Sequence, residues 1–555
     1  MSPAKVREPQ TRAAGWEAAV AERRRRIEAE PLPRNIWTLL EEAAADCPDR
    51  TALHFIEGDV RIDYAALRST VARVAEGLAT LGVGRGSHVG VMLRNVPEMP
   101  VTWLALARLG AVMVPVNVRS TGRELHYALT DSEASHLVLG AEFLPVFEAM
   151  PERLPALAGR VVVAGPCPDA FLPWDSLAAR GTESYRPPVE PGLDDLVNIQ
   201  YTSGTTGLPK GCMLTQRYWL ICAKSYADCD GLRYRNILAG NPFFYMTPQW
   251  LTLMAFLQRA TLHVAPYRSL TRYVTWIQEN AIDFCLFPPD IHTARPPGPE
   301  DVCSTMVRGN LYIHRPQDHA AMERRFGFPL RTAFGMTEIG MGTFTPIEAA
   351  EMTGSGSCGL AAPFRECRIA SPEGDALPPG TAGELQFRGP GLLLGYWRKP
   401  EATAAAFHGE WFRTGDLATM DERGFVTIVG RIKEMIRRAG ENISATEVEA
   451  VLLGIPGVAE AAALPAPDPL RGEEVMACLR LQPGCTPADL PPERVVEQCR
   501  QGLAVFKLPR YVVYCEDPLP RSTSGKVQKP ALLERMPELL ARSWDRAAND
   551  RVGRA

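Results

Sequence analysis

Paired cysteines are what this sequence most clearly lacks. Its thirteen cysteines are odd in number and scattered, and no two of them form a C-x-x-C pair. Disulfide frameworks and zinc sites of the usual spacing both need such pairs, so both are disfavoured. Free thiols are typical of a reducing compartment, and we therefore expect a cytoplasmic protein.

Uninterrupted hydrophobic runs are also missing. The longest apolar stretch, residues 99–118, has Arg108 in its middle and is broken by Gly110 and Pro115. A membrane-spanning helix needs about 20 predominantly apolar residues, so this stretch predicts a buried helix, a glycine stop and a core strand instead. The N-terminal residues also lack the apolar segment of a signal peptide. We expect no membrane span.

A large excess of charge of one sign is absent as well. The chain has 60 Lys and Arg against 64 Asp and Glu, a net charge of −4, which gives no field that would attract nucleic acid. The densest basic run, ERRRRIEAE at residues 22–30, has glutamates around its arginines. This mixture favours a solvated helix over a polyanion site. We therefore expect no nucleic-acid partner.

The patterns that are present indicate an α/β protein of two to four domains, because 555 residues are too many for one core. Helical patterns alternate with short β-branched runs over residues 34–200 and again up to residue 336, which predicts a parallel sheet with helices on both faces. Short hairpin-like strands from about residue 360 predict a small antiparallel unit. A compact α/β tail follows Gly430, and its helix opens with a predicted capping box, Ser444 to Glu447. No Pro/Ser-rich linker marks this boundary, so the joint should be tight.

One loop stands out chemically. YTSGTTGLPKG, residues 201–211, lies between two apolar segments. It has three glycines, four serine or threonine side chains and one lysine. Backbone N–H groups freed by glycine, with hydroxyls and a lysine, can cradle phosphate oxygens. The Walker pattern needs a glycine directly before the lysine, whereas Pro209 precedes Lys210 here. The stretch predicts a phosphate loop of another kind, with a plain flexible turn as the alternative.

Three further stretches favour the phosphate loop. FGMTE at residues 334–338 offers Glu338 to Mg²⁺ and Thr337 to a phosphate. WFRTGD ends in Asp416, a carboxylate that can accept from two ribose hydroxyls, and PRSTSGK places Lys526 in a glycine-containing turn. Each stretch alone is typical of a turn. Their order and spacing together indicate a nucleotide site.

Together with GRIKEMIRRAGENISATEVE at residues 430–449, these motifs resemble the adenylate-forming superfamily of acyl-CoA ligases, amino-acid adenylation domains and firefly-type luciferases. The resemblance covers roughly residues 35–535. It is strongest to acyl-CoA ligases of the carnitine/crotonobetaine type, because of residues 91–117 and the RAGENIS variant. It implies that a carboxylic acid reacts with ATP and Mg²⁺ to give an acyl-adenylate, whose acyl group then passes to coenzyme A.

The resemblance also implies a role for each motif residue. Thr337 would touch the α-phosphate, Glu338 would bind Mg²⁺, and Lys526 would bridge the α-phosphate and the acid. The ribose would be held by Asp416 and Arg431. The residues implied in cradling the phosphates are Thr202, Ser203, Gly204, Thr205, Thr206, Gly207 and Lys210.

A mobile C-terminal domain is implied too. In such enzymes this domain swings about a hinge between the two steps, and Lys433 matches the hinge position. The swing withdraws Lys526 and brings in Gly440, which would line the tunnel for pantetheine. The predicted organisation is an N-terminal extension (1–33), a large domain with a small antiparallel β unit (34–430), a hinge (431–433) and a small mobile α+β domain (434–555).

Two departures from the family pattern concern the substrate sites. Tyr245 stands where a P-x-F-H motif commonly has histidine, and residues 307–318 replace a stretch usually rich in Gly and Ala, which leaves the adenine contacts unassigned. The residues expected to form an apolar, aromatic-rich acyl site for a bulky acid are Tyr245, Met246, Trp250, Phe334, Gly335 and Met336.

Other functions fit less well. An amino-acid adenylation domain usually offers an aspartate that PFFYM lacks, nothing here favours oxygen chemistry, and a non-enzymatic protein would be expected to lose Lys526 or Glu338. Two alternatives to the complete ligase stay open because of the departures. One is an enzyme that only thioesterifies a supplied adenylate, and the other is an adenylation-only enzyme. The acid, the pathway and the oligomeric state, a homodimer included, are also open.

Overall fold

The computed structural model describes residues 15–202, 209–294, 296–312, 316–438, 441–469, 471–521 and 527–548. The chain separates into two compact units. The first contains the chain up to Thr202, Lys210–Glu366 and Arg388–Ala404, and the second contains Cys367–Phe387 and the residues from Ala405 onward. The predicted α/β class is confirmed, while the domain limits at residues 34, 430 and 434 stay a prediction.

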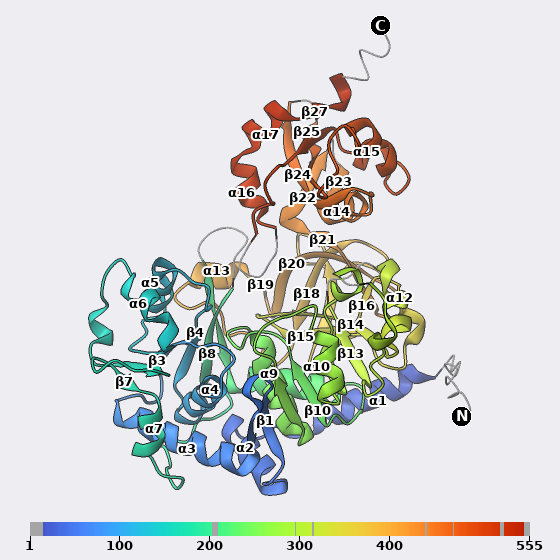
Figure 1. The fold of residues 1–555 in the computed structure, drawn as a ribbon. Helices are drawn as coiled ribbons and strands as arrows, with labels where there is room; N and C mark the ends of the chain where they lie inside the picture. The colour runs from blue at the N-terminus through green and yellow to red at the C-terminus, as the bar shows by residue number, and fades with distance from the viewer. Residues whose placement is uncertain are drawn as a thin grey trace. The chain divides into compact units, whose positions relative to one another are not determined.

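The first unit has two β-sheets, although the sequence predicted a single parallel sheet (Figure 1). In one of them the strand order is β7-β6-β5-β3-β4-β8-β9, with all neighbours parallel except β8 and β9. Strands such as β3 are buried along their whole length, as expected where helices cover both faces. The bounds are β3 His88–Met92, β4 Val112–Pro115, β5 His136–Gly140, β6 Val161–Ala164, β7 Leu172–Pro173, β8 Leu196–Thr202 and β9 Lys210–Thr215.

The other sheet of this unit runs β2-β1-β11-β10-β12-β13-β14-β15-β16. Its strands are parallel from β1 to β14, and β2, β15 and β16 are antiparallel additions at the two ends. The bounds are β1 Thr51–Phe55, β2 Val60–Asp63, β10 Asn236–Ala239, β11 Thr261–Val264, β12 Phe284–Leu286, β13 Arg308–Leu311, β14 Leu330–Met336, β15 Gly340–Phe344 and β16 Ser357–Ala361.

Helices fill the space between these two sheets. Helix α4 packs on β4 and β8, α9 packs on β10 and β11, and α2 contacts both helices. The indole rings of Trp103 on α4 and Trp219 on α8 meet edge to face at 5.4 Å within this layer. The 99–118 stretch forms a helix, a left-handed Gly110 and a strand, as predicted. The bounds are α2 Ile36–Asp46, α3 Tyr64–Thr80, α4 Glu98–Leu109, α8 Gln216–Asp228 and α9 Met246–Gln258.

The arginine-rich segment forms helix α1, Trp16–Ala29, but one face of it is docked rather than solvated. Val20 and Ile27 are buried, and Arg23 donates to the Glu348 carboxylate at 2.9 Å and to the backbone carbonyl of residue 229 at 2.8 Å. Arg24 donates to the Arg365 carbonyl at 2.6 Å. The expectation of a solvated helix is therefore wrong for this face, because its acceptors come from segments distant in sequence.

The second unit contains the predicted antiparallel strands and α/β tail. Strand β20 pairs antiparallel with β18 and β21, and β25 pairs antiparallel with β24 and parallel with β26. The bounds are β18 Gly383–Arg388, β20 Trp411–Met420, β21 Val426–Arg431, β22 Met435–Arg438, α14 Ala445–Leu453, β24 Val458–Asp468, β25 Gly472–Leu481, α15 Pro492–Cys499, β26 Tyr511–Tyr514, α16 Lys529–Glu534, α17 Met536–Arg542 and β27 Trp544–Asp545.

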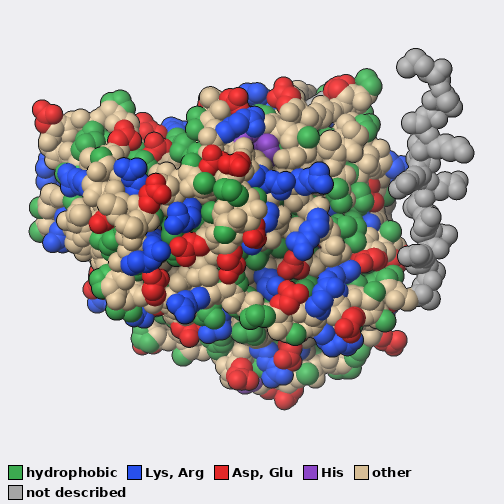
Figure 2. Space-filling model, turned by 90° about the horizontal axis from the view of Figure 1, so that it is seen from below, with side chains coloured by type: hydrophobic (Ala, Val, Ile, Leu, Met, Phe, Trp, Pro, Cys, Tyr) green, Lys and Arg blue, Asp and Glu red, His purple; other side chains and the backbone are tan. Residues whose placement is uncertain are grey.

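The surface matches the balanced charge of the chain. Figure 2 shows basic and acidic side chains interspersed over the face in view. Within the described ranges, no helix is long and apolar enough to cross a membrane. All thirteen cysteines are free thiols.

Candidate active site

The predicted phosphate loop joins the two strands of an antiparallel hairpin. Thr202 at the end of β8 and Lys210 at the start of β9 are register partners, and the Thr202 hydroxyl donates to the Lys210 carbonyl at 3.4 Å. Lys210 therefore opens a strand, whereas a Walker lysine opens a helix. The other predicted loop residues, Ser203, Gly204, Thr205, Thr206 and Gly207, lie outside the described residues.

The FGMTE motif occupies the end of β14 and the turn into β15. Thr337 and Glu338 lie in this turn, and the Glu338 side chain is buried, with 8% of the residue exposed. Gly335 is required here, because a Cβ at this position would lie 2.6 Å from the backbone oxygen of Gly340. The close approach keeps the hairpin tight and fixes the direction of the turn that presents Thr337 and Glu338.

Tyr396 lies between the phosphate-loop lysine and the predicted metal ligand. Its hydroxyl donates to Glu338 Oε1 at 3.1 Å, and Lys210 Nζ lies 4.2 Å from the centre of its ring. Burial, and next the charge of Glu338, raise the pKa of Tyr396, so the phenol stays protonated and donates. Tyr396 is not among the residues predicted from the sequence. Its only local signal is an aromatic pair, YW, directly after the glycine-flanked GLLLG run.

The backbone around Tyr396 ties these two elements together. Met213 N donates to the Gly395 carbonyl at 3.0 Å and Trp397 N to the Gly211 carbonyl at 2.8 Å, so the segment runs beside β9. Leu393 N donates to the Glu338 carbonyl at 2.9 Å. One short segment therefore positions both the lysine strand and the carboxylate turn.

The residues present fit a magnesium ion that arrives with ATP. Mg²⁺ is usually held by one or two carboxylates together with substrate phosphates and water. Glu338 supplies one buried carboxylate, and no group of three or more potential metal-binding side chains occurs among the residues that the structure describes. This donor set suits a metal completed by phosphate oxygens rather than one caged by protein alone.

Helix α8 brings the predicted acyl-site residues together. The Tyr226 ring stacks on Trp250 at 3.8 Å between ring centres, and the Tyr218 hydroxyl lies 3.9 Å from the sulfur of Met246. The Tyr226 hydroxyl also lies beside Gly335 on β14. Tyr218 and Tyr226 were not predicted from the sequence, although residues 218, 222 and 226 recur every four positions and so share one helix face.

The turn that contains Tyr245 is held by two buried amide side chains. Gln200 on β8 donates to the Phe244 carbonyl at 2.7 Å. Gln249 on α9 donates to the carbonyls of Phe243 at 3.0 Å and Tyr245 at 3.2 Å. Tyr245 itself lies at the N-terminus of α9 and is half-buried. Phe334 and Met336, on β14, are also half-buried. The turn is therefore fixed from both the phosphate-loop strand and the helix.

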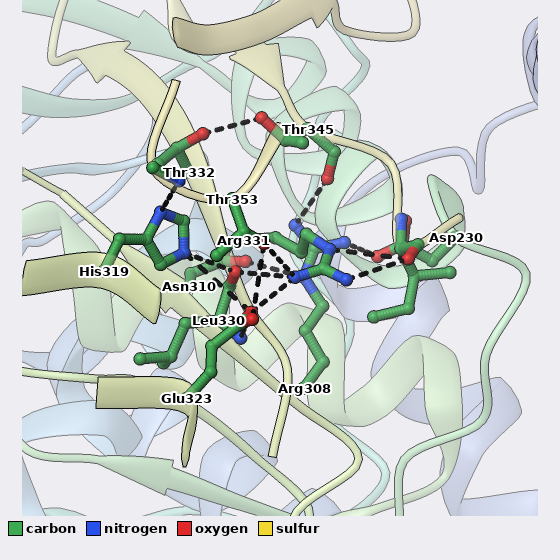
Figure 3. Close-up of polar contacts among 12 residues, drawn as sticks. Asp230, Arg308, Asn310, His319, Glu323, Leu330, Arg331, Thr332, Thr345 and Thr353 are labelled. Carbon is green, nitrogen blue, oxygen red and sulfur yellow. Dashed lines mark hydrogen bonds and ion pairs between the residues drawn. The ribbon is translucent and has the colours of Figure 1, made fainter. Parts of the chain in front are cut away.

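The stretch 307–318 forms β13 and the start of α12 (Pro316–Phe326), with residues 313–315 outside the description. A buried polar network holds it, and Figure 3 shows the side chains pointing toward one another. Arg308 on β13 pairs with Asp230, and Arg331 on β14 pairs with Glu323 on α12 at 2.6 Å. His319 lies against the Leu330 carbonyl at 2.9 Å. These contacts fix the strand that ends in FGMTE.

The second unit holds the predicted ribose residues. Asp416 on β20 and Arg431 on β21 are register partners and form an ion pair of 2.6 Å, with Asp416 buried. Lys433 follows in the 3-10 turn Ile432–Glu434, although its side chain lies outside the description. Gly440 and Lys526 also lie outside the described residues. The structure thus brings together Asp416 and Arg431, the two residues predicted to hold the ribose.

A pocket of about 470 Å³ in the second unit is rich in arginine. Glu474, which is fully buried, pairs with Arg438 at 2.6 Å and with Arg471 at 2.9 Å. Arg510 pairs with Asp468 on β24 and with Asp545 on β27. This pocket was not predicted from the sequence, because its arginines come from separate segments. The lining residues are Arg438, Arg471, Glu474, Val505, Phe506, Arg510, Arg546 and Ala547.

The chain matches the models of two protein families. Residues 40–397 match the AMP-binding enzyme family, and residues 447–526 match the AMP-binding enzyme C-terminal domain. The chain belongs to this family. The hairpin loop and the Glu338 turn lie within the first matched range.

Curated relatives of this AMP-binding enzyme are acyl-CoA ligases. It is 31% identical over 512 residues to a long-chain-fatty-acid–CoA ligase of Mycobacterium tuberculosis, covering 90% of this chain and 98% of the relative. It is 32% identical over 493 residues to a feruloyl-CoA synthase of Amycolatopsis, covering 87% and 95%. A crotonobetaine/carnitine–CoA ligase of Salmonella arizonae is 31% identical over 526 residues, with 90% and 98% covered.

Solved structures agree with this assignment. MatB from Rhodopseudomonas palustris with ATP bound has a TM-score of 0.80 at 28% identity, covering 90% of this chain and 98% of that one. The o-succinylbenzoate-CoA synthetase MenE of Bacillus subtilis, in complex with its acyl-adenylate, has a TM-score of 0.78 at 25% identity, with the same coverage. The predicted adenylate-forming superfamily, fold class and enzyme type are confirmed. This AMP-binding enzyme is an ATP-dependent, AMP-forming acyl-CoA ligase.

Proposed function

We propose that this enzyme activates a bulky, apolar carboxylic acid and transfers it to coenzyme A. The observation that carries the acid class is the contact set on α8, where Tyr226 stacks on Trp250 and Tyr218 touches Met246. The Tyr226 hydroxyl beside Gly335 pairs with the Tyr312 hydroxyl at 2.7 Å, and the rest of this contact set consists of aromatic rings and the Met246 thioether. Apolar ligand surface gains about 25 cal/mol per Å² on burial against such residues.

Adenylation in this site is a matter of positioning and charge neutralisation. A carboxylate oxygen of the acid attacks the α-phosphorus of ATP, and pyrophosphate leaves. Lys210 and the loop after Thr202 would hold the β- and γ-phosphates, and Thr337 would donate to the α-phosphate. Glu338 would hold Mg²⁺, which supplies positive charge to phosphate oxygens when bound. Lys526 would bridge the acid and the α-phosphate, as its motif implies.

The second step needs a site for coenzyme A, whose thiol displaces AMP to give the thioester. Coenzyme A carries several phosphate charges, and guanidinium groups bind phosphate through paired hydrogen bonds. The arginine-lined pocket holds four such groups, three of which also pair with carboxylates, beside exposed apolar surface at Val505. We propose that this pocket receives the nucleotide part of coenzyme A. The free thiols of the chain suit a cytoplasmic setting.

A panel of acids tests the proposed substrate class. Pyrophosphate release is measured with aryl and long-chain acids, and with short-chain and dicarboxylic acids as matched controls, each with and without coenzyme A. We expect kcat/KM at least about tenfold higher for the bulky apolar acids, the effect of burying two or more methylene groups. A preference for short or dicarboxylic acids would contradict the proposed class.

Adding two measurements, thioester formation and the reaction of a synthetic acyl-adenylate with coenzyme A, separates the two alternatives that the sequence left open. Thioester formation from a synthetic acyl-adenylate, with negligible pyrophosphate release from any acid, would indicate an enzyme that carries out only the second step. Pyrophosphate release without thioester formation would indicate adenylation alone. The complete ligase predicts both activities with the same acid.

A further inference from the structure

Tyr396 joins two oppositely charged side chains through two different parts of one phenol. The Lys210 ammonium lies 4.2 Å from the centre of its ring, and its hydroxyl donates to Glu338 Oε1 at 3.1 Å. Lys210 and Glu338 form no ion pair with each other, as far as the described part of the chain shows. A neutral aromatic residue therefore stands where a direct lysine–glutamate pair could otherwise form.

The surrounding contacts hold this phenol in place. Tyr396 N donates to the Thr403 hydroxyl at 2.9 Å, and Tyr396 itself forms an isolated bridge with Cys212 on β9. The residue is 5% exposed. Such a side chain keeps its orientation before any ligand arrives, so its ring and its hydroxyl offer fixed reference points for the two charged groups.

We infer that Tyr396 is a positioning residue that sets Lys210 to receive ATP phosphates and Glu338 to receive the metal that accompanies them. This inference rests on the proposed function. The ring holds the Lys210 ammonium, and the hydroxyl holds the Glu338 carboxylate. Both contacts leave the ammonium able to donate to phosphate and the carboxylate able to bind a metal. A direct ion pair would instead have to separate before phosphate and metal could bind.

The two halves of the phenol make separable contributions. The Tyr396→Phe variant keeps the ring under Lys210 and removes only the hydroxyl that orients Glu338. The Tyr396→Leu variant removes both. The Tyr64→Phe variant is a matched control, because Tyr64 is a buried tyrosine of the same unit whose hydroxyl donates to the carbonyls of Ala255 and Ala260.

Calorimetric binding of a non-hydrolysable ATP analogue, with Mg²⁺ and separately with chelator, measures both contributions without turnover. For Tyr396→Phe we expect metal-free affinity within twofold of wild type, and about a tenfold loss of the enhancement that Mg²⁺ gives, the effect of one hydrogen bond to a charged group. For Tyr396→Leu we expect a metal-free affinity about threefold below that of Tyr396→Phe, the effect of one cation–π contact. Tyr64→Phe should match wild type in both.

Each other outcome has one meaning. A wild-type protein whose analogue binding gains nothing from Mg²⁺ contradicts the proposed metal role of Glu338, and hence the proposed function. A normal Mg²⁺ enhancement in both wild type and Tyr396→Phe overturns the inference alone. An equal loss in Tyr64→Phe overturns it too, because the effect would then be one of general stability. Equal metal-free affinity in the Phe and Leu variants overturns the part assigned to the ring.

Discussion

At the scale of single residues, Arg365 shows how one buried side chain supports the candidate site. It is 1% exposed and donates to the carbonyls of Ile339, Phe364, Pro390 and Gly391 at 2.6 to 3.1 Å. Ile339 directly follows Glu338, and residues 390–391 lead toward Tyr396. Burial lowers the pKa of Arg365 to about 10, which still leaves it charged at neutral pH.

We expect the Arg365→Met variant to lose about 3 kcal/mol of unfolding free energy, because it leaves the buried Ile339 carbonyl and three part-buried carbonyls without a donor. Arg365→Lys should restore little, since an ammonium group has three donors and lacks the planar fork by which the guanidinium reaches four carbonyls. Chemical denaturation followed by tryptophan fluorescence measures the change. Arg61→Met, at a half-exposed arginine paired with Asp59, is the control and should stay within about 0.5 kcal/mol of wild type. A similarly small change in Arg365→Met would contradict the structural role.

The sequence predicted the site residues that belong to local motifs. It did not predict those that contact the site from positions distant in sequence. Lys210, Glu338 and Asp416 belong to local patterns whose chemistry can be interpreted from neighbouring letters. Tyr396 reaches Glu338 from 58 positions away, and Tyr226 reaches Trp250 across a helix pair. Such contacts depend on how strands and helices pack, which a single sequence does not encode in any local pattern.

At the scale of elements, the join between β1 and β11 contains a buried histidine pair. His54 Nδ1 lies 2.9 Å from His263 Nδ1, and His54 Nε2 lies 2.8 Å from the exposed Asp59 carboxylate. Burial, and next the neighbouring His54, lower the pKa of His263 to about 3. One shared proton suits the two facing nitrogens, whereas a further proton would set two N–H groups against each other.

We therefore expect acid to destabilise this sheet edge. The pKa of His263 is lower in the folded than in the unfolded chain, so its stabilising effect is complete above about pH 6.5 and is lost as the pH falls toward 3. The free energy of unfolding should fall by up to about 1.4 kcal/mol per pH unit between pH 6 and 4. Denaturation curves of wild type and His263→Gln should differ in this slope, while the exposed His408→Gln should behave like wild type. Equal slopes in wild type and His263→Gln would contradict the assignment.

The arginine-lined pocket allows a second prediction at this scale. We expect Arg471→Ala to raise the KM for coenzyme A about tenfold, because a half-exposed guanidinium no longer binds a phosphate, while pyrophosphate release stays unchanged. Arg480→Ala, at the other end of β25 and outside the pocket lining, is the matched control. Steady-state kinetics of thioester formation measure the effect. An unchanged KM for coenzyme A, or an equal rise in Arg480→Ala, would argue against the pocket.

Element boundaries were predicted better than the contacts of their ends. Ser444 caps α14 as predicted, accepting from Glu447 N at 3.3 Å. The Glu447 carboxylate, however, binds Lys507 at 2.6 Å rather than returning to the cap. The reciprocal half of the predicted capping box is thus replaced by a tertiary ion pair. The split of the first unit into two sheets was also missed, because β-branched runs look alike in either sheet.

At the scale of the whole molecule, the account requires the two half-reactions to depend on different residues. Lys526→Ala should lower adenylate formation by roughly two to three orders of magnitude, as expected for losing one preorganised charge, and leave thioester formation from supplied adenylate intact. Lys433→Pro should do the reverse, since proline fixes φ and removes a backbone donor at the predicted hinge. Rapid-quench assays of each step test this pair. Equal effects of either variant on both steps would contradict the roles.

We expect this one protein to make an acyl-adenylate and then to consume it. The most direct measurement mixes wild-type enzyme, at a concentration above that of the acid, with ATP and Mg²⁺, and follows all products by mass spectrometry before and after coenzyme A is added. We expect one equivalent of pyrophosphate and of enzyme-bound acyl-AMP per acid first, and then AMP and the thioester in equal amounts. Formation of ADP, or of thioester without a preceding acyl-AMP, would contradict it.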